Sequence, residues 1–226
     1  DYEMPEGFDY KFTGEQENQD ESTAFLGTAL LIAVFSIFLI IVSQFNSISS
    51  PFIIMASVLF STIGVFLGLV IFQMNFVIIM TGIGIISLAG VVVNNAIVLI
   101  DYTNLVRKRR RAELGIPDSG RLPDDEIINS IVEAGSTRLR PVLLTAITTV
   151  LGLNPLALGM NIDFYGLFSR LDPNYYTGGD NAAFWGPMAW TVIFGLTFAT
   201  FLTLVIVPVM YLIADRIKIS IGRSTT

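Results

Sequence analysis

The sequence contains no cysteine and no histidine. Without cysteine the chain can form no disulfide, and without either residue it lacks the usual ligands of zinc and copper sites. A hydrolytic triad with histidine as its general base is excluded as well. We therefore expect no metal centre, no cofactor and no enzymatic activity. No nucleic-acid partner is expected either.

Charged residues are scarce and strongly segregated. They make up 14% of the chain, whereas an ordinary soluble domain has about a quarter. No acidic or basic residue occurs in residues 22–100, 141–162 or 181–214. Crossing a hydrocarbon core of ~30 Å takes about 20 apolar residues in a helix, so each of these stretches is long enough. The chain is predicted to be an integral membrane protein whose main surroundings are a lipid bilayer.

Polar residues and prolines divide the long apolar stretches into single spans. Helices are the spanning structure that fits, because strands of a membrane barrel would alternate polar and apolar residues. The expected spans are residues 23–43, 51–72, 76–104, 139–159 and 184–213. The predicted fold class is therefore an all-α integral membrane protein, with five transmembrane helices in a bundle, a short cytoplasmic helix and a periplasmic loop.

The lysines and arginines predict the orientation of these spans. Of the 13 basic residues, all except Lys11 and Arg170 lie in residues 105–140 or in the tail at 215–226. Because cytoplasmic loops carry an excess of basic residues, we expect the N-terminus outside and the C-terminus in the cytoplasm. The loop 105–138, with a helix from about residue 123, is then cytoplasmic. The acidic segment 1–22 and the loop 160–183 are then expected outside, which in a bacterial inner membrane is the periplasmic side.

Small residues follow one face of the second span. Their spacing of four, three and four residues matches a helix, and they are Ser57, Ser61, Gly64 and Gly68. Gly64 and Gly68 form a small-xxx-small pair, which lets two helix backbones approach closely in lipid. We expect this face to pack against another helix. Gly90 on the third span is also assigned to packing, with local mobility as the alternative.

Two adjacent amides, Asn94 and Asn95, interrupt the apolar run GVVVNNAIVLIDY in the third span. A buried amide in hydrocarbon is costly, so polar residues at this depth usually face a partner helix or a wet cavity. Asn94 and Asp101 are seven residues apart and share one face of the helix. The third span therefore carries a polar stripe.

The fourth span carries a matching stripe. Arg138 and Thr145 are seven residues apart, and Thr149 lies one turn beyond. Since the two spans run antiparallel from one loop, we expect their polar stripes to meet. The amides and Thr145 are either interhelical hydrogen-bonding groups or part of a relay for protons. Because no carboxylate lies deep in any span, the chain cannot carry protons on its own.

The sequence resembles a known family of exporters. The strings that carry the resemblance are YKFTGEQENQDES, SQFNS, GVVVNNAIVLIDY, STRLRPVLLTAITTVLGLNPLAL and WTVIFGLTFATFLTLVIVPVMYL. They are similar to the C-terminal transmembrane half of the resistance–nodulation–division (RND) multidrug efflux pumps, hydrophobe/amphiphile branch. The resemblance implies the last five helices of that half, starting at the end of the periplasmic porter domain, in a larger protein.

The resemblance also implies a function and partners. Pumps of this family are trimers in the bacterial inner membrane that export drugs against an inward flow of protons. They work with a periplasmic adaptor and an outer-membrane channel. An aspartate pair in the N-terminal transmembrane half carries the proton. Asn94 stands where many members have a lysine facing that pair, and Asn95, Arg138 and Thr145 match positions near the relay, with Asp101 and Thr149 as possible support.

Other interpretations remain open. Arg138 also fits a cation that sets topology at the membrane boundary. As an isolated piece, the chain is alternatively a structural membrane module without transport activity. A relative that exports lipid or metal is less favoured, because the motifs match drug exporters and because histidine and cysteine are absent.

Overall fold

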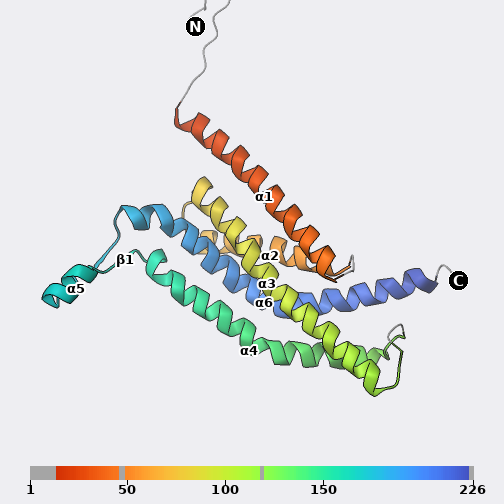
Figure 1. Cartoon of the computed structure of the whole chain (residues 1–226). Helices are drawn as coiled ribbons and strands as arrows, with labels where there is room; N and C mark the ends of the chain where they lie inside the picture. The colour runs from red at the N-terminus through yellow and green to blue at the C-terminus, as the bar shows by residue number, and fades with distance from the viewer. Residues whose placement is uncertain (1–13, 46–48, 118–119, 224–226) are drawn as a thin grey trace, which may run out of the picture.

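The computed structural model describes residues 14–45, 49–117 and 120–223, most of which are helical (Figure 1). The five long helices are α1 Glu15–Phe45, α2 Ser49–Ile71, α3 Ile78–Glu113, α4 Asp124–Ala157 and α6 Asp180–Arg223. Each of them is long and apolar enough to cross a membrane. The predicted all-α fold class with five spanning helices is therefore confirmed.

Helix α6 packs against α2, α3 and α4, while α1 lies along the outside of α2 and α3 (Figure 1). Within the described helix α1, Ile41 is the only buried residue. The interior of the bundle is aliphatic and includes Ile54, Val65, Leu88, Ala96, Leu196 and Val207. Side chains on the outside of the helices are largely apolar as well, as a membrane-spanning chain requires.

The small-residue face of α2 lies directly against α6. A Cβ atom added at Gly64 would come within 2.3 Å of the Phe198 Cβ, and one at Gly68 within 2.2 Å of the Phe194 Cγ. A side chain at either glycine would therefore force the facing phenylalanine or the two helices to shift. The same face carries two further buried small residues, Ser57 and Ser61.

Gly90 does not take part in such a contact. It is exposed, and a Cβ atom added there would meet no heavy atom within 4 Å among the described residues. The packing role expected for Gly90 is thus not found in this chain, because Gly90 lies on the side of α3 that faces away from the bundle.

Four helices extend well beyond the expected spans, since α1 already begins at Glu15 and α6 runs on to Arg223. Helix α3 continues to Glu113 through the basic cluster, because arginine, lysine, alanine and glutamate favour helix as well as aliphatic residues do. It ends before Gly115, which has a φ of 66°. Helix α4 runs unbroken from Asp124 through Pro141. The short cytoplasmic helix expected from about residue 123 is therefore the first part of α4. A proline loses one backbone hydrogen bond but has a φ that suits a helix.

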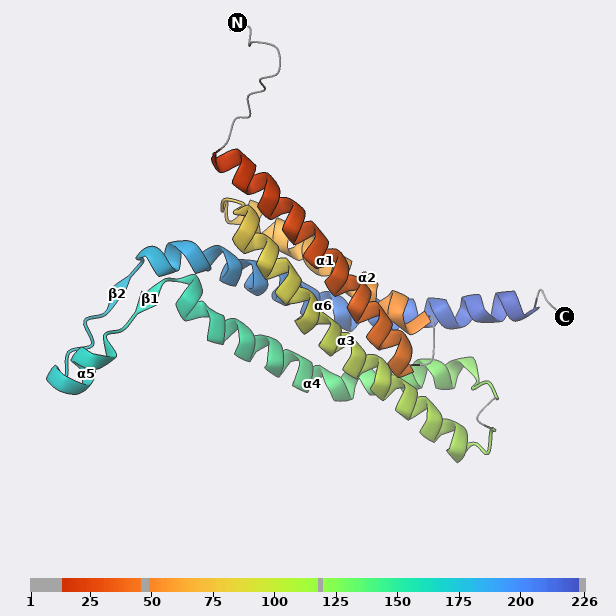
Figure 2. The same cartoon turned by 45° about the horizontal axis from the view of Figure 1, so that its top comes forward.

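Between α4 and α6 the chain forms a small excursion, which stands away from the bundle in both views (Figures 1 and 2). Strands β1 (Met160–Asn161) and β2 (Tyr176–Thr177) pair antiparallel at its base, with Met160 opposite Thr177. The short helix α5 (Phe164–Arg170) forms its tip.

Candidate functional site

The two amides of α3 face different surroundings. Asn95 is buried in the bundle, whereas Asn94 is exposed. This difference follows from their places on the helix, because consecutive residues are about 100° apart around its axis. Within the described chain neither amide side chain has a hydrogen-bond partner. Asn94 is therefore free to meet a group from outside this chain.

The exposed side of α3 is polar over several turns. It carries Ser87, Gly90, Asn94 and Asp101, all exposed and spaced as one helix face. The opposite side is buried against the bundle, through residues such as Leu88, Val92 and Leu99. No helix of the described chain covers the polar side, which we call the open polar face of α3.

The predicted threonines of α4 are bonded within their own helix. The Thr145 hydroxyl donates to the Val142 carbonyl at 2.9 Å, and the Thr149 hydroxyl donates to the Thr145 carbonyl at 2.8 Å. Thr145 is exposed, so its side chain faces away from the bundle like that of Asn94. Among the described residues, no hydrogen bond joins these threonines to Asn94 or Asp101.

Helices α3 and α4 do meet near Arg138, through Tyr102 of α3, which the sequence did not single out. The Arg138 guanidinium lies over the Tyr102 ring, with its central carbon 4.3 Å from the ring centroid. The Arg138 Nε is buried and has no hydrogen-bond partner in the described structure. In the described chain Arg138 thus contacts Tyr102 of α3, and the predicted contact between the stripe of Asn94 and Asp101 and that of Arg138 and Thr145 stays a prediction.

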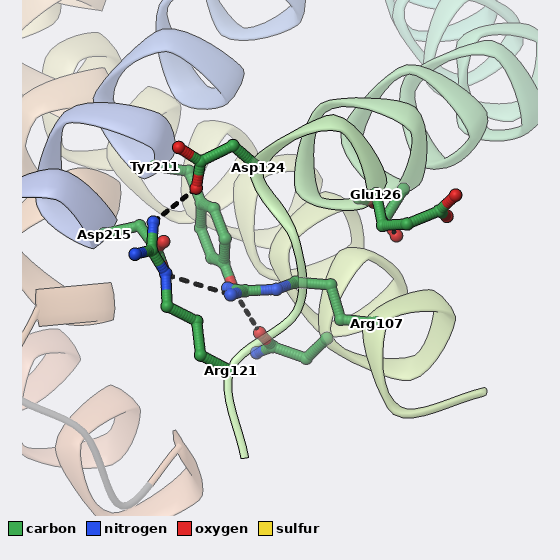
Figure 3. A network of polar contacts seen from close by, with 8 residues as sticks. Arg107, Arg121, Asp124, Glu126, Tyr211 and Asp215 are labelled. Atoms are coloured by element: carbon green, nitrogen blue, oxygen red, sulfur yellow. Dashed lines mark hydrogen bonds and ion pairs between the residues drawn. The ribbon is translucent and has the colours of Figure 1, made fainter. Parts of the chain in front are cut away.

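A second polar network joins the C-terminal parts of α3 and α6 (Figure 3). Arg107 of α3 donates to the Tyr211 hydroxyl at 2.8 Å and to an Asp215 carboxylate oxygen at 2.9 Å. Tyr211 in turn donates to the side-chain oxygen of Asn104. The side chains of Arg107 and Asp215 are only 12% and 21% exposed. This half-buried pair ties α6 to α3 just beyond the charge-free stretches of both helices.

Arg110 extends these contacts from α3 to α4. Its guanidinium lies 3.2 Å from Glu133 and 3.8 Å from Glu126, both on α4. These groups are more exposed than Arg107 and Asp215, and exposed ion pairs contribute little to stability. Sequence reasoning assigned the basic cluster to topology and missed the network. The available signal was Asp215, which ends a long charge-free stretch one turn after Tyr211.

Metal ligands are not grouped in the described part of the chain. No set of three or more acidic, histidine or cysteine residues there is placed to hold a metal ion. The polar groups that the structure brings together are instead amides, hydroxyls and arginines. Such groups can orient, donate to and stabilise a carboxylate from another part of a protein.

Comparison with known proteins places these features in a family. The model of the AcrB/AcrD/AcrF family matches residues 1–215. The swarming motility protein SwrC of Bacillus subtilis is 36% identical over 193 residues, which cover 85% of this chain and 15% of SwrC. The multidrug resistance protein MdtC of Klebsiella pneumoniae is 27% identical over 197 residues, covering 87% of this chain and 16% of MdtC.

Metal exporters are similar as well. The cobalt-zinc-cadmium resistance protein CzcA of Cupriavidus metallidurans is 27% identical over 214 residues, covering 94% of this chain and 17% of CzcA. A crystal structure of a heavy metal efflux pump is similar with a TM-score of 0.66 and 27% identity, covering 90% of this chain and 17% of that pump. The chain thus spans about a sixth of the length of these relatives. It belongs to the AcrB/AcrD/AcrF family of RND efflux transporters.

Proposed function

We propose that the chain is part of the membrane domain of a proton-driven exporter, which exchanges protons for drugs. The observation that carries this proposal is the open polar face of α3, with Asn94 near the middle of the helix and Asp101 two turns further on. A polar face at that depth in a membrane protein calls for a polar partner. The N-terminal transmembrane half of the pump would supply it as the proton-carrying aspartates.

The chain's own groups suit a supporting role in this reaction. An amide neither gains nor loses a proton near neutral pH, so Asn94 can donate a hydrogen bond to a carboxylate without carrying charge. That donation favours the ionised carboxylate, though less than a lysine would. Arg138, held over Tyr102, supplies positive charge where protons leave toward the cytoplasm. The proposed activity is transport, without covalent chemistry.

The substrates proposed are hydrophobic or amphiphilic compounds, chosen by the porter domain of the complete pump. The resemblance of the membrane motifs to drug exporters and the similarity to MdtC support this class. The similarity to CzcA favours metal export as the second candidate. The complete pump is proposed to be a trimer that works with a periplasmic adaptor and an outer-membrane channel.

The proposed location is the bacterial inner membrane, with a periplasmic N-terminus and a cytoplasmic C-terminus. The distribution of basic residues supports this orientation, since the network of Arg107 and Arg110 then lies on the cytoplasmic side.

The function is tested by changing Asn94 in the full-length pump. Asn94→Leu removes the donor at a similar side-chain volume, and losing a hydrogen bond to a charged group costs about 1.5–3 kcal/mol. The facing carboxylate should then hold its proton more tightly, so dye efflux should fall and its pH optimum should move upward. Asn94→Lys should move the pH optimum downward. Efflux is measured in vesicles with an imposed proton gradient.

Protein abundance and membrane insertion serve as controls for both variants. If Asn94→Leu lowers thermal stability but leaves the pH profile of efflux unchanged, Asn94 only packs between helices. Zinc or cobalt transport without drug efflux would instead favour metal as the substrate.

A further inference from the structure

Helix α5 exposes an unusually apolar side. Phe164 is 65% exposed, Tyr165 79%, Phe168 84% and Leu171, which directly follows the helix, 87%. Phe164 and Tyr165 are four and three residues before Phe168, so both lie beside Phe168 on the surface of α5. Arg170 lies toward the opposite side. Contiguous exposed apolar patches of this kind mark interaction surfaces.

The excursion that carries α5 is held together by its polar groups, not by this apolar side. The Asn161 amide donates to the carbonyls of Gly159 and Gly178, at 2.9 and 2.7 Å. The Asp163 carboxylate accepts from the Gly166 backbone N–H at the start of α5, at 3.0 Å. The aromatic side chains are therefore left available for a partner.

The position of α5 indicates which partner this is. The excursion leaves the end of α4 and returns to the start of α6, so both of its ends lie at the membrane boundary. Exposed apolar side chains occur both on the last turns of α4 and at the start of the excursion, at Leu151, Leu158, Met160 and Ile162. The start of α6 adds two exposed aromatics, Phe184 and Trp185. Aromatic residues are enriched where a membrane protein meets the lipid headgroups.

In both views α5 stands away from the bundle, beyond the end of α4 and the start of α6 (Figures 1 and 2). Helix α5 takes no part in the extensive packing between the described helices. The chain thus holds the apolar side of α5 near the end of α4 and the start of α6, where a membrane-spanning protein meets the lipid headgroups.

We propose that α5 is a membrane-surface anchor. Its apolar side lies among lipids at the boundary between headgroups and acyl chains, on the side of the membrane where α4 ends and α6 begins. Arg170 and the polar groups of the excursion face water. This proposal rests on the membrane-spanning fold and not on the proton-coupled function, so either can fail without the other.

The absence of native cysteine in this chain allows a direct test. Phe168→Cys and the matched control Arg170→Cys are made in the full-length pump, with any cysteines elsewhere replaced, and each is labelled with a nitroxide. The pump is reconstituted in vesicles of phosphatidylethanolamine and phosphatidylglycerol. Electron paramagnetic resonance then compares collisions with oxygen, which concentrates in lipid, and with a water-soluble nickel chelate.

We expect the label at Phe168 to collide more with oxygen than with nickel, at a depth of about 5–10 Å into the interface. The label at Arg170 should show the reverse. Tyr165→Cys provides a second site that should behave like Phe168. If the Phe168 label prefers nickel, α5 stands in water and the proposal is wrong. If that label is shielded from both reagents, another part of the pump covers α5, which also overturns the proposal.

Discussion

At the scale of single residues, the guanidinium of Arg138 lies 4.3 Å from the centroid of the Tyr102 ring. Its Nε is buried without a hydrogen-bond partner among the described residues. A cation that is partly removed from water needs compensation, and the face of an aromatic ring provides it at about 0.5–2 kcal/mol. We therefore consider Tyr102 to be the residue that positions Arg138 for the proposed proton pathway.

Replacing the ring tests this role. Tyr102→Leu should release the guanidinium, and a loss of about 1 kcal/mol corresponds to a roughly fivefold smaller population of the positioned arginine. Efflux should slow by a similar factor, with the KM for drug little changed, because drug is bound elsewhere in the pump. Tyr102→Phe keeps the ring and should behave like the unchanged protein. Turnover and KM are measured from dye efflux in reconstituted vesicles.

Arg138→Ala tests separately whether Arg138 takes part in proton movement and whether Tyr102 acts through it. If Arg138→Ala leaves efflux unchanged, Arg138 has no part in proton movement. If Arg138→Ala slows efflux while Tyr102→Leu does not, the arginine acts without the help of the ring.

At the scale of elements, the half-buried contact between Arg107 and Asp215 joins α3 to α6. The Tyr211 hydroxyl lies between Arg107 and Asn104 and adds a second link between the same helices. Helix α6 also packs on α2 and α4. A movement of α3 at this end would therefore also move α6 against these two helices. The contacts with α6 thereby fix the position of α3, and with it the open polar face, relative to the other helices.

The strength of this link can be measured with Asp215→Asn. The change keeps the shape of the side chain but removes the charge opposite Arg107, and should lower stability by about 1–3 kcal/mol. Asp124→Asn is the matched control, because it removes the charge from an exposed pair with Arg121, worth at most about 1 kcal/mol. Thermal unfolding of the purified pump in detergent compares the two. Equal effects would mean that Arg107 and Asp215 do not brace the helices.

Features that depend on residues close in the sequence could be predicted, whereas contacts between distant helices could not. The five spans follow from hydropathy, and the face of α2 from Ser57 to Gly68 follows from helical spacing. The extension of α3 to Glu113 could not be located by hydropathy, because the apolar run ends before the helix does. The network of Arg107 with Asp215 depends on which helix ends meet in space, and spacing within one helix carries no such information. For the same reason the sequence did not show that Asn95 is buried and Asn94 exposed.

At the scale of the whole molecule, the bundle buries α2, α3 and α6 far more than α1 and α4. Half of the apolar window of α2 and of α3 is buried, but only 6% of that of α1 and 11% of that of α4. In a membrane such exposed apolar faces are in contact with lipid or with further helices. The open polar face of α3 is a part of this surface for which lipid offers no hydrogen-bonding partner.

The proposed orientation of the whole bundle can be tested by labelling from one side of the membrane. Arg109→Cys lies in the exposed basic extension of α3, and Arg170→Cys lies on α5 between α4 and α6. Because the basic residues predict a cytoplasmic α3–α4 connection, a maleimide that cannot cross membranes should label position 170 in intact spheroplasts. It should reach position 109 only after the inner membrane is permeabilised. Labelling of position 109 but not 170 in intact spheroplasts would reverse the topology and place the Arg107 network on the periplasmic side.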